Sequence, residues 1–478
     1  MEMEDFDITI GLEVHVQLST QTKLFCSCGT KFAQPQNSQV CPVCLGLPGA
    51  LPVLNKKALE LGVKAALALN CTIPEKSKFD RKNYFYPDLP KGYQISQYDE
   101  PVSEKGFLEI RTPEGSKKIG IIRAHLEEDA GKLIHSESGQ DYSYVDLNRA
   151  GVPLLEIVSA PDMESPDEAY QYLTELKKIL QYIEVSDCNM QEGSLRCDAN
   201  ISIKPKGSKV LGTKTEIKNL NSFNFIRKAL QYEATRQYQC LKRGERIEQA
   251  TYTWLEKENR TEKMRSKEDA HDYHYFPDPD LPPFRLEKNW IESLRSALPE
   301  LPQGRLQRMM EQYALNMSDA ELLTQNRQEA DYFEECARYF QDYRELMNWI
   351  KGKVYTYLNE KNLTIAQFPV SPENLAELLQ LVSMKKISRE AGKEILDKMI
   401  ATGKKAASFA QSKEKISDPT IIAEFCEKIL SRFSHLVIEY KSKPNVLNSL
   451  MGNVMKESQG RADAEKVREI LLKMLEKE

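Results

Sequence analysis

Apolar and polar residues alternate strictly between residues 8 and 18. The even positions are all apolar, whereas the odd positions include Glu13, His15 and Gln17. This period-two pattern predicts a strand that buries one face and displays polar side chains on the other. Glu13 and His15 would be neighbours on the polar face, about 7 Å apart along the strand. For a single strand, a solvated outer face is the simpler interpretation.

Four further segments predict strands, and each places polar ligands in the same way. They are residues 119–128, 154–159, 195–203 and 213–220. Together with the first strand they offer Glu13, His15, Glu127, Glu128, Glu156, Asp198, Asn200 and Glu216. Carboxylates that converge from separate strands of an antiparallel sheet can hold a divalent metal in a phosphate-handling site. The set therefore indicates a metal site, with an exposed polar sheet face as the alternative.

Two of these strands carry more detailed expectations. Glu156 interrupts the apolar run Leu-Leu-Glu-Ile-Val, where an unpaired carboxylate would be expensive to bury. In residues 119–128, Ile122, Ala124, Leu126 and Glu128 are expected on one face of the strand, and the residues between them on the other face. We also expect residues 144–148 and 154–159 to form a hairpin.

Helical patterns separate and follow the strands. Residues 55–69, 165–183 and 222–243 predict helices, the second of them opened by a capping box at Ser165. From about residue 301 the chain is almost wholly helix-like, with further helix starts at Ser371 and Ser388. These patterns predict an α+β fold with an antiparallel sheet followed by helices. The proline-rich residues 276–283 predict an exit from the first domain, and a second boundary is expected near residues 401–407.

Residues 78–98 mix aromatic residues, cations and turn residues without helical or strand periodicity. Arg81, Lys82 and Lys91 are candidates for contacting phosphates. An aromatic loop packed onto a domain core explains the composition equally well.

Four cysteines form two closely spaced pairs. Cys26 and Cys28 are followed, after twelve residues, by Cys41 and Cys44. Four thiolates supplied by two turns predict a closed, tetrahedral zinc site, which is structural because it leaves no position open for a reactant.

Composition narrows the class of protein. A chain of 478 residues with 41% hydrophobic and 29% charged residues is typical of a globular protein with several domains. A net charge of −5 gives no general affinity for nucleic acid, so any RNA contact must come from local basic patches. The sequence shows neither a signal peptide nor an apolar run of membrane-spanning length, which predicts a cytoplasmic protein with reduced cysteines and no membrane contact.

Common catalytic motifs are missing. The sequence contains no Gly-x-x-x-x-Gly-Lys-Ser/Thr loop, no Gly-x-Gly-x-x-Gly motif after a strand and no obvious Cys-His or Ser-Lys nucleophile. If ATP is used, the fold is therefore not a P-loop fold, and the chain is not expected to liberate ammonia itself. Cations near the C-terminus (Lys441, Lys443, Lys456 and Arg461) could touch RNA, although a solvated helical bundle is the simpler interpretation.

Several long strings of residues resemble one known family. They are residues 10–18, 78–88, 125–132, 146–159 and 192–202. These strings closely resemble the B subunit of the glutamyl-/aspartyl-tRNA amidotransferase, and the resemblance extends more weakly into the helical tail.

This resemblance implies an ATP-dependent ligase. The B subunit would use Mg-ATP to phosphorylate the side-chain carboxylate of Glu-tRNA(Gln), Asp-tRNA(Asn) or both. Ammonia from a partner amidase, the A subunit, would then displace the phosphate, in a heterotrimer completed by a small C subunit. The implied domains are a glutamine-synthetase-like catalytic domain with the zinc loop (1–292), a helical domain (293–405) and a tRNA-binding tail (406–478).

The resemblance also implies roles for individual residues. The magnesium ligands and catalytic residues would be Glu13, His15, Glu128, Glu156, Asp198 and Glu216. Lys82 would lie at the end of an ammonia channel, and Arg81, Lys82 and Asn200 would contact ATP. A histidine is an unusual magnesium ligand, and the chain has Asp272-Tyr-His274 where the family usually has arginine at the third position.

Two other classes of function are consistent with the residues alone. One is an RNA-binding adaptor that carries the zinc site and no chemistry. The other is a metal-dependent phosphoesterase that uses the same carboxylates.

Overall fold

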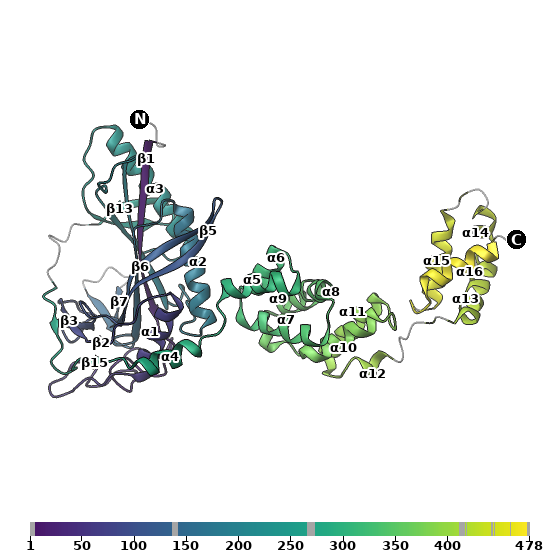
Figure 1. Cartoon of the computed structure of the whole chain (residues 1–478), viewed down its shortest axis with the longest axis horizontal. Coiled ribbons are helices and arrows are strands. Elements are labelled where there is room, and N and C mark those ends of the chain that lie inside the picture. Colours follow the sequence, from purple (N-terminus) through teal and green to yellow (C-terminus); the bar gives the residue numbers. More distant parts are fainter. Residues whose placement is uncertain are drawn as a thin grey trace. The chain divides into compact units, whose positions relative to one another are not determined.

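The computed structural model of the chain describes residues 5–135, 142–264, 273–410, 416, 418–440, 443, 445–458 and 460–475. The chain forms two compact units, residues 1–302 and 303–478, whose elements are labelled in Figure 1. The first unit contains the sheet and the second is helical, which confirms the predicted α+β class.

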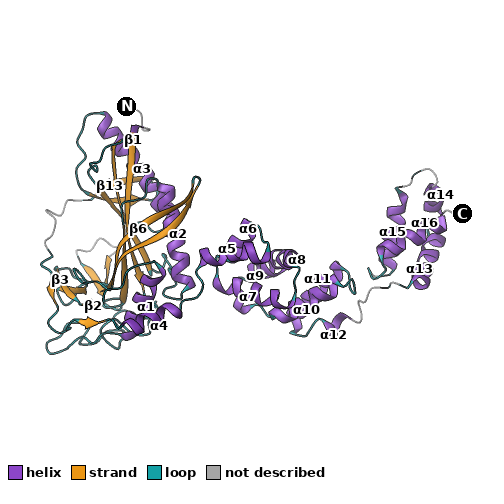
Figure 2. Cartoon of the chain, in the orientation of Figure 1, coloured by secondary structure: helices purple, strands orange, loops and turns teal. Residues whose placement is uncertain are grey.

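An eight-stranded sheet forms the centre of the first unit (Figure 2). Its strand order is β13-β12-β11-β10-β1-β9-β6-β5, and every neighbouring pair is antiparallel except β11 and β12. The strands are β1 (Phe6–Gln17), β5 (Ser103–Thr112), β6 (Gly115–Glu128), β9 (Pro153–Ser159), β10 (Leu195–Pro205), β11 (Thr215–Lys218), β12 (Thr251–Leu255) and β13 (Arg260–Lys263). The five predicted strands are all present.

One face of this sheet packs against helices. The helices are α1 (Lys56–Ala68), α2 (Pro166–Tyr182) and α3 (Phe223–Lys242), and they share a hydrophobic core with the sheet. The even residues of β1 from Ile10 to Val16 lie in that core, as the alternation predicts. The Ser165 hydroxyl accepts a hydrogen bond from the Glu168 amide, so the predicted N-cap of α2 is confirmed. The polar face of β1 is therefore directed away from the helices.

Within residues 119–128, the predicted face of the strand is wrong for one side chain. The register of β6 against β9 shifts between Ile121 and Arg123, as in a β-bulge. Ile121 is buried in the core, whereas the side chain of Ile122 is 52% exposed. The bulge therefore carries an apolar side chain out of the core.

The predicted hairpin between residues 144–148 and 154–159 is also wrong. Strand β8 (Ser143–Asp146) pairs with β7 (Lys132–His135), in a separate two-stranded sheet. Strand β9 lies between β1 and β6 instead. A strand that pairs on both sides is buried more deeply, which explains its nearly continuous apolar sequence.

Residues 76–98 contain short strands that periodicity does not reveal. Strands β3 (Asp80–Asn83) and β4 (Tyr93–Ser96) form a small sheet with β14 (Phe276–Pro277). Strand β2 (Lys76–Ser77) pairs with β15 (Phe284–Arg285), and α4 (Lys288–Ser296) follows. The proline-rich residues 276–283 thus lie within the first unit, with strand pairs on either side of them.

The second unit consists of helices, as predicted. A first hydrophobic cluster is built by α5 (Pro302–Tyr313), α6 (Met317–Leu323), α7 (Arg327–Tyr339), α8 (Tyr343–Trp349), η2 (Ile350–Val354), α9 (Tyr355–Lys361), η3 (Ile365–Gln367), α10 (Pro372–Ser383), α11 (Arg389–Thr402) and α12 (Ala407–Ala410). A separate cluster is built by α13 (Pro419–Arg432), α14 (Ser434–Tyr440), α15 (Val446–Glu457) and α16 (Ala464–Leu475). Ser371 and Ser388 are the N-caps of α10 and α11, as expected.

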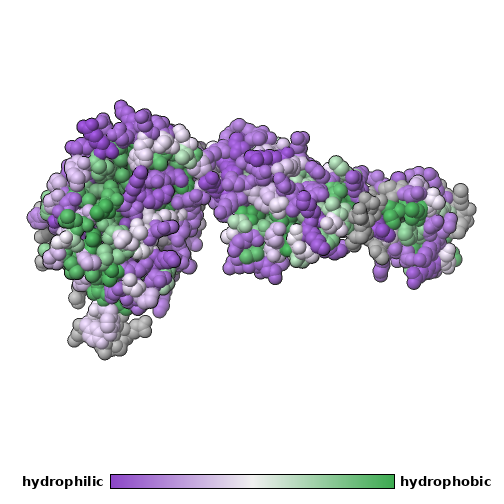
Figure 3. All heavy atoms as spheres, turned by 90° about the horizontal axis from the view of Figure 1, so that it is seen from below, coloured by the Kyte–Doolittle hydropathy of each residue, from purple (hydrophilic) through white to green (hydrophobic). Residues whose placement is uncertain are grey.

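Hydrophilic residues cover most of the helical parts on the face shown in Figure 3, and apolar residues gather in smaller areas. None of the helices among the described residues combines the length and the apolar character needed to cross a membrane.

Candidate metal centre

Three strands bring two histidines and a glutamate together on the polar face of the large sheet. His15 of β1 and His125 of β6 each lie opposite Glu156 of β9 in the strand register. The Nε2 atoms of both histidines lie 3.4 Å from Oε2 of Glu156. The carboxylate that looked too costly to bury is thus held between two imidazoles.

Glu127 completes this group. Its Oε1 lies 3.7 Å from Nε2 of His15, and its Oε2 lies 3.8 Å from Nε2 of His125. Ligand atoms of His15, Glu127 and Glu156 all lie within 4.8 Å of one another. We refer to these three residues as the central cluster.

The electrostatics of the central cluster reflect its burial. Burial opposes protonation of His125, but the charges of Glu156 and Glu127 and their hydrogen bonds outweigh burial and raise its pKa to about 9. Burial likewise opposes protonation of His15, and hydrogen bonding to Glu156 raises its pKa. For Glu156, burial favours the neutral acid, yet the two histidines lower the pKa well below its usual range. The carboxylates of this site are therefore stabilised by positive charge.

The donor set of the central cluster fits a divalent cation. Two carboxylates and one imidazole converge on one point, which is a common ligand set for a metal that also keeps bound water. Nδ1 of His125 is buried without a hydrogen-bond partner among the described residues. Its Nε2 already faces the carboxylates, so this residue can orient them without being a ligand itself.

A second acidic group lies beside the first. Glu13 of β1 faces Asp198 of β10 in the register, and Glu216 of β11 faces Asn200. Nζ of Lys218 lies 2.9 Å from Asp198 and 3.2 Å from Glu216. We refer to Glu13, Asp198 and Glu216 as the lateral carboxylates.

Glu13 connects the two groups. Burial raises its pKa, and the charges of Glu156, Glu216 and Asp198 raise it further. Its Oε1 accepts a hydrogen bond of 3.2 Å from the Asn200 side-chain amide. Crowded carboxylates of this kind favour a cation that neutralises them, and Nζ of Lys218 already supplies one to Asp198 and Glu216.

A cavity of about 300 Å³ adjoins the lateral carboxylates. It is lined by Glu13 and Asn200, by Gly11 and Gly212, and by Lys214. The amide and the lysine can pair with an anionic group, and the apolar side chains of Val158, Pro161 and Leu211 complete the lining.

Lys82 lies near the central cluster. Burial opposes its charge, but Glu127 and the neighbouring Tyr275 and Glu156 raise its pKa, so it remains a cation. Its Nζ lies 4.8 Å from the ring centroid of Tyr273 and 6.0 Å from that of Tyr84. The structure thus places a fixed positive charge beside the carboxylates.

Three predicted residues are directed elsewhere. The Glu128 carboxylate is bound by Nζ of Lys91 and accepts a hydrogen bond of 3.1 Å from the Ile95 amide, so the structure does not bring it into either acidic group. Arg81 is bound to Asp278 at 2.8 Å and to Asp280 at 2.9 Å. The charges of Arg81 and Lys91 are therefore already balanced within the protein.

The sequence offers Glu127 among the polar ligands, but the resemblance implies Glu128 in its place, and His125 is not selected at all. The period-two pattern could have identified both Glu127 and His125 as part of the polar face, because they alternate along the strand with the buried Ala124 and Leu126. Glu128 has the parity of the core residues, and its carboxylate is accordingly buried away from the polar face.

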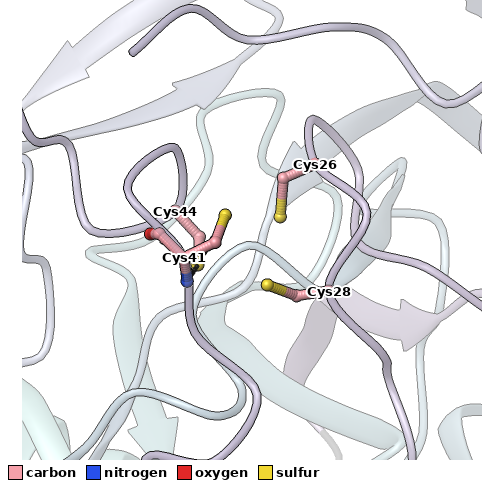
Figure 4. A group of neighbouring side chains, drawn as sticks. All are labelled: Cys26, Cys28, Cys41 and Cys44. Carbon is pink, nitrogen blue, oxygen red and sulfur yellow. Dashed lines mark hydrogen bonds between the residues drawn. The ribbon is translucent and has the colours of Figure 1, made fainter. Parts of the chain in front are cut away.

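The four predicted zinc ligands converge in one place. Figure 4 shows the side chains of Cys26, Cys28, Cys41 and Cys44 pointing toward one another, and their sulfur atoms lie within 4.8 Å of one another. This geometry is compatible with tetrahedral zinc.

A buried lysine supports the cysteine cluster. Hydrogen bonding from Cys26 lowers the pKa of Cys44 to about 4, and the Cys41 amide and Lys23 contribute. Nζ of Lys23 lies 3.6 Å from Sγ of Cys44, and Lys23 is fully buried. A thiolate is the form that binds zinc. Lys23 stabilises that form at Cys44, whereas the hydrogen bond with Cys44 raises the pKa of Cys26 and burial raises that of Cys28 to about 11.

His274, which stands where the family usually has arginine, lies on the surface. His274 has a positive φ of 41°, and its carbonyl accepts a hydrogen bond of 2.7 Å from the Asn83 side chain. Asp272 lies outside the described residues.

Two family profiles match this chain. That of the GatB/GatE catalytic domain matches residues 8–292, and that of the GatB domain matches residues 331–475. The first match contains the central cluster, the lateral carboxylates and the cysteine cluster.

Relatives match along the whole length. The chain is 49% identical over 480 residues to the aspartyl/glutamyl-tRNA(Asn/Gln) amidotransferase B subunit of Carboxydothermus hydrogenoformans, covering 99% of this chain and 100% of the relative. A protein of the same name from Geotalea daltonii is 49% identical over 477 residues, covering 99% and 100%. Another from Thermodesulfovibrio yellowstonii is 47% identical over 473 residues, covering 98% and 99%.

Proposed function

This chain belongs to the family of the GatB/GatE catalytic domain, and on that premise we propose how its metal centre works. The protein is the B subunit of a tRNA-dependent amidotransferase, an ATP-using ligase that converts Glu-tRNA(Gln), Asp-tRNA(Asn) or both into the amidated products. The observation that carries this conclusion is identity of 49% along 99% of the chain. The adaptor and phosphoesterase interpretations are not favoured.

The two acidic groups are proposed as magnesium sites. His15, Glu127 and Glu156 would hold one ion, with His125 orienting the carboxylates. Glu13, Asp198 and Glu216 would hold a second ion if that ion displaced Lys218 from Asp198 and Glu216. Bound magnesium neutralises the charge of the phosphoryl group in transfer. Glu128, which the resemblance implied as a ligand, is left out of this proposal because its carboxylate is bound by Lys91.

ATP is proposed to occupy the cavity beside the lateral carboxylates. Asn200 and Lys214 line that cavity, and Glu13 lies at its border with the central cluster. The γ-phosphate would then lie over the carboxylates, and the glutamyl or aspartyl side chain would attack it. Arg81 would act only if it exchanged one of its aspartate partners for a phosphate, and Lys82 would reach the phosphate from the central cluster.

The second half-reaction needs ammonia as a neutral nucleophile. The fixed charge of Lys82 disfavours ammonium relative to ammonia, because like charges repel. Ammonia would attack the acyl phosphate, the carbon–oxygen bond to phosphate would break, and the released proton would leave with the phosphate or a neighbouring carboxylate. The products are the side-chain amide and inorganic phosphate.

The remaining parts of the chain have supporting roles. The protein is proposed to work in a heterotrimer with an amidase (the A subunit) and with the small C subunit, and the tail from residue 406 is proposed to hold the tRNA. The helical domain of residues 293–405 would connect that tail to the catalytic domain of residues 1–292. Zinc held by the four cysteines would fix the loop around them, and the cytoplasm is the proposed compartment.

The test is release of the γ-phosphate of ATP by the purified heterotrimer. We expect release to require magnesium and to rise strongly when Glu-tRNA(Gln) is added. Release that ignores the misacylated tRNA, in a heterotrimer shown to be assembled, would contradict the proposed function.

A further inference from the structure

A second cavity opens on the polar face of the sheet, on the other side of β9 from the proposed ATP cavity. Its volume is about 490 Å³, and its lining includes Tyr98, Ile122, Arg123, Gly120 and Ala160. None of these residues belongs to the central cluster or to the lateral carboxylates.

The cavity presents flat and apolar surfaces. Tyr98 and Ile122 are both 52% exposed, which is unusual for large apolar side chains that lie side by side around one hollow. Tyr98 stacks on Tyr275, with ring centroids 4.3 Å apart and planes 14° apart. The stack fixes the orientation of an exposed aromatic ring, as a platform for a planar ligand requires.

Arg123 lines the cavity, and one of its side-chain nitrogens is an unpaired donor within the part of the chain that the structure describes. Its Nε is buried without a hydrogen-bond partner among the described residues. Burying such a donor costs free energy unless a ligand pairs with it. The bulge between Ile121 and Arg123 sets this position, because it shifts the register of β6 at the cavity.

The charges of the lining favour a base over a phosphate. Asp99 and Glu104 line the cavity together with Lys105. The nearby Lys78 is bound to Asp99 at 2.7 Å. A site for a phosphate would need an excess of free cations, whereas a planar base with donors and acceptors on its edge suits this mixture.

The cavity is connected to the central cluster along one strand. Arg123, His125 and Glu127 alternate on the polar side of β6, and successive members are about 7 Å apart on standard strand geometry. Tyr275 stacks on Tyr98 beside this path. Burial raises the pKa of Tyr275, and the charges of Lys82 and Arg123 partly oppose that rise. A ligand whose base lies on Tyr98 can therefore extend a short arm to the carboxylates.

The two cavities lie on opposite sides of Val158. In the register, Val158 of β9 faces Glu13 on one side and Arg123 on the other. Phosphoryl transfer requires donor and acceptor to approach from opposite sides of the transferred group. If ATP fills the cavity beside Glu13, the acceptor must come from the side of Arg123.

We propose that Tyr98, Ile122 and Arg123 form a purine nucleoside pocket for the 3′-terminal adenosine of the misacylated tRNA. The adenine lies on Tyr98 against Ile122, Arg123 pairs with the edge of the nucleoside, and the aminoacyl arm follows β6 to the central cluster. This inference rests on the proposed function. ATP also carries an adenosine, so the test separates the two sources.

The experiment measures KM for Glu-tRNA(Gln) and for ATP with the assembled heterotrimer, and inhibition by the trinucleotide CCA. Tyr98→Ala should raise KM for Glu-tRNA(Gln) about tenfold or more, because a base stacked on an aromatic ring is worth that much. It should leave KM for ATP within about twofold and abolish competitive inhibition by CCA. Tyr98→Phe keeps the ring and should behave as wild type, and Arg123→Gln should follow Tyr98→Ala. Tyr144→Ala, at a tyrosine that is 58% exposed outside the cavity, is the matched control.

Each outcome decides the inference. A rise in KM for ATP alone in Tyr98→Ala would assign the pocket to ATP and overturn the proposal. Unchanged KM values for both substrates in Tyr98→Ala and in Ile122→Ala would show that the cavity binds no nucleoside. Ile122 is exposed, so its truncation should not disturb folding. Failure of the proposed function appears separately, as wild-type heterotrimer whose phosphate release ignores the tRNA.

Discussion

Glu127 and Glu128 follow one another on β6, yet their carboxylates lie on opposite faces of the sheet. Glu127 lies 3.7 Å from His15 in the central cluster. Glu128 is bound by Lys91 and by the amide of Ile95, beneath the sheet surface that carries the site. Substitutions at these two positions should therefore separate loss of chemistry from loss of stability.

Lys91→Met should destabilise the first unit. The Lys91 and Glu128 side chains are only 9% and 5% exposed, so the substitution leaves a buried carboxylate without its counter-charge. We expect the free energy of unfolding to fall by about 3 kcal/mol, measured as a lower urea midpoint. The double variant Lys91→Met/Glu128→Leu should recover most of the loss. If Lys91→Met alone were as stable as wild type, the ion pair would not stabilise the fold.

The cysteine cluster should bind one zinc ion per chain. Cys44→Ser removes the thiolate that Lys23 contacts at 3.6 Å, so zinc content and the thermal unfolding midpoint should both fall. Elemental analysis and a melting curve measure these effects. Cys240→Ser is the control, since Cys240 lies outside the cluster. Full zinc content in Cys44→Ser would count against the four-thiolate site.

Asp129 should make the folding stability of the protein depend on pH. Burial alone would raise its pKa, but Arg196 and Arg149 outweigh burial and lower it. A group whose pKa is lower in the folded state stabilises the fold above its unfolded pKa of about 3.9, and loses that effect as pH falls through the folded pKa. Asp129→Asn should cost about 2 kcal/mol at pH 7.

Thermal melts of wild type and Asp129→Asn between pH 7 and pH 3 check this prediction. The difference between the two proteins should shrink below about pH 4. A difference that stays constant down to pH 3 would show that the charge of Asp129 contributes nothing to folding.

Local rules were enough for much of the fold. The strand at β1 follows from strict alternation, and the start of α2 follows from Ser165 and Pro166, because both signals act between near neighbours in sequence. The cysteine cluster follows from spacing alone. The resemblance added the reaction and named most of the residues proposed as ligands.

Other features depend on contacts that sequence periodicity does not encode. Strand β9 pairs with β1 and β6 rather than with β8, the strand before it. The bulge before Arg123 exposes Ile122 against its parity. The alternation of residues along β6 was enough to favour Glu127 over Glu128. The cavity at Tyr98 could not be predicted in this way, because Tyr98 stacks on Tyr275, which is distant in sequence.

Removal of the C-terminal helices should weaken tRNA binding without affecting ATP. Helices α13 to α16 share a hydrophobic cluster of their own, so truncation after Ala410 does not open the larger helical core. We expect KM for Glu-tRNA(Gln) to rise about tenfold, with KM for ATP unchanged. Equal KM values for the tRNA in the truncated and full-length heterotrimers would remove the tail from tRNA recognition.

The most direct test compares Glu127→Gln with Glu128→Gln in the assembled heterotrimer. The measurement is magnesium-dependent release of γ-phosphate from ATP in the presence of Glu-tRNA(Gln), per folded heterotrimer. Glu127→Gln should lower this rate by about 100-fold or more, because it removes a charge from the central cluster, while Glu128→Gln should retain most of it. Release that persists in Glu127→Gln and disappears in Glu128→Gln would contradict the metal centre described for this protein.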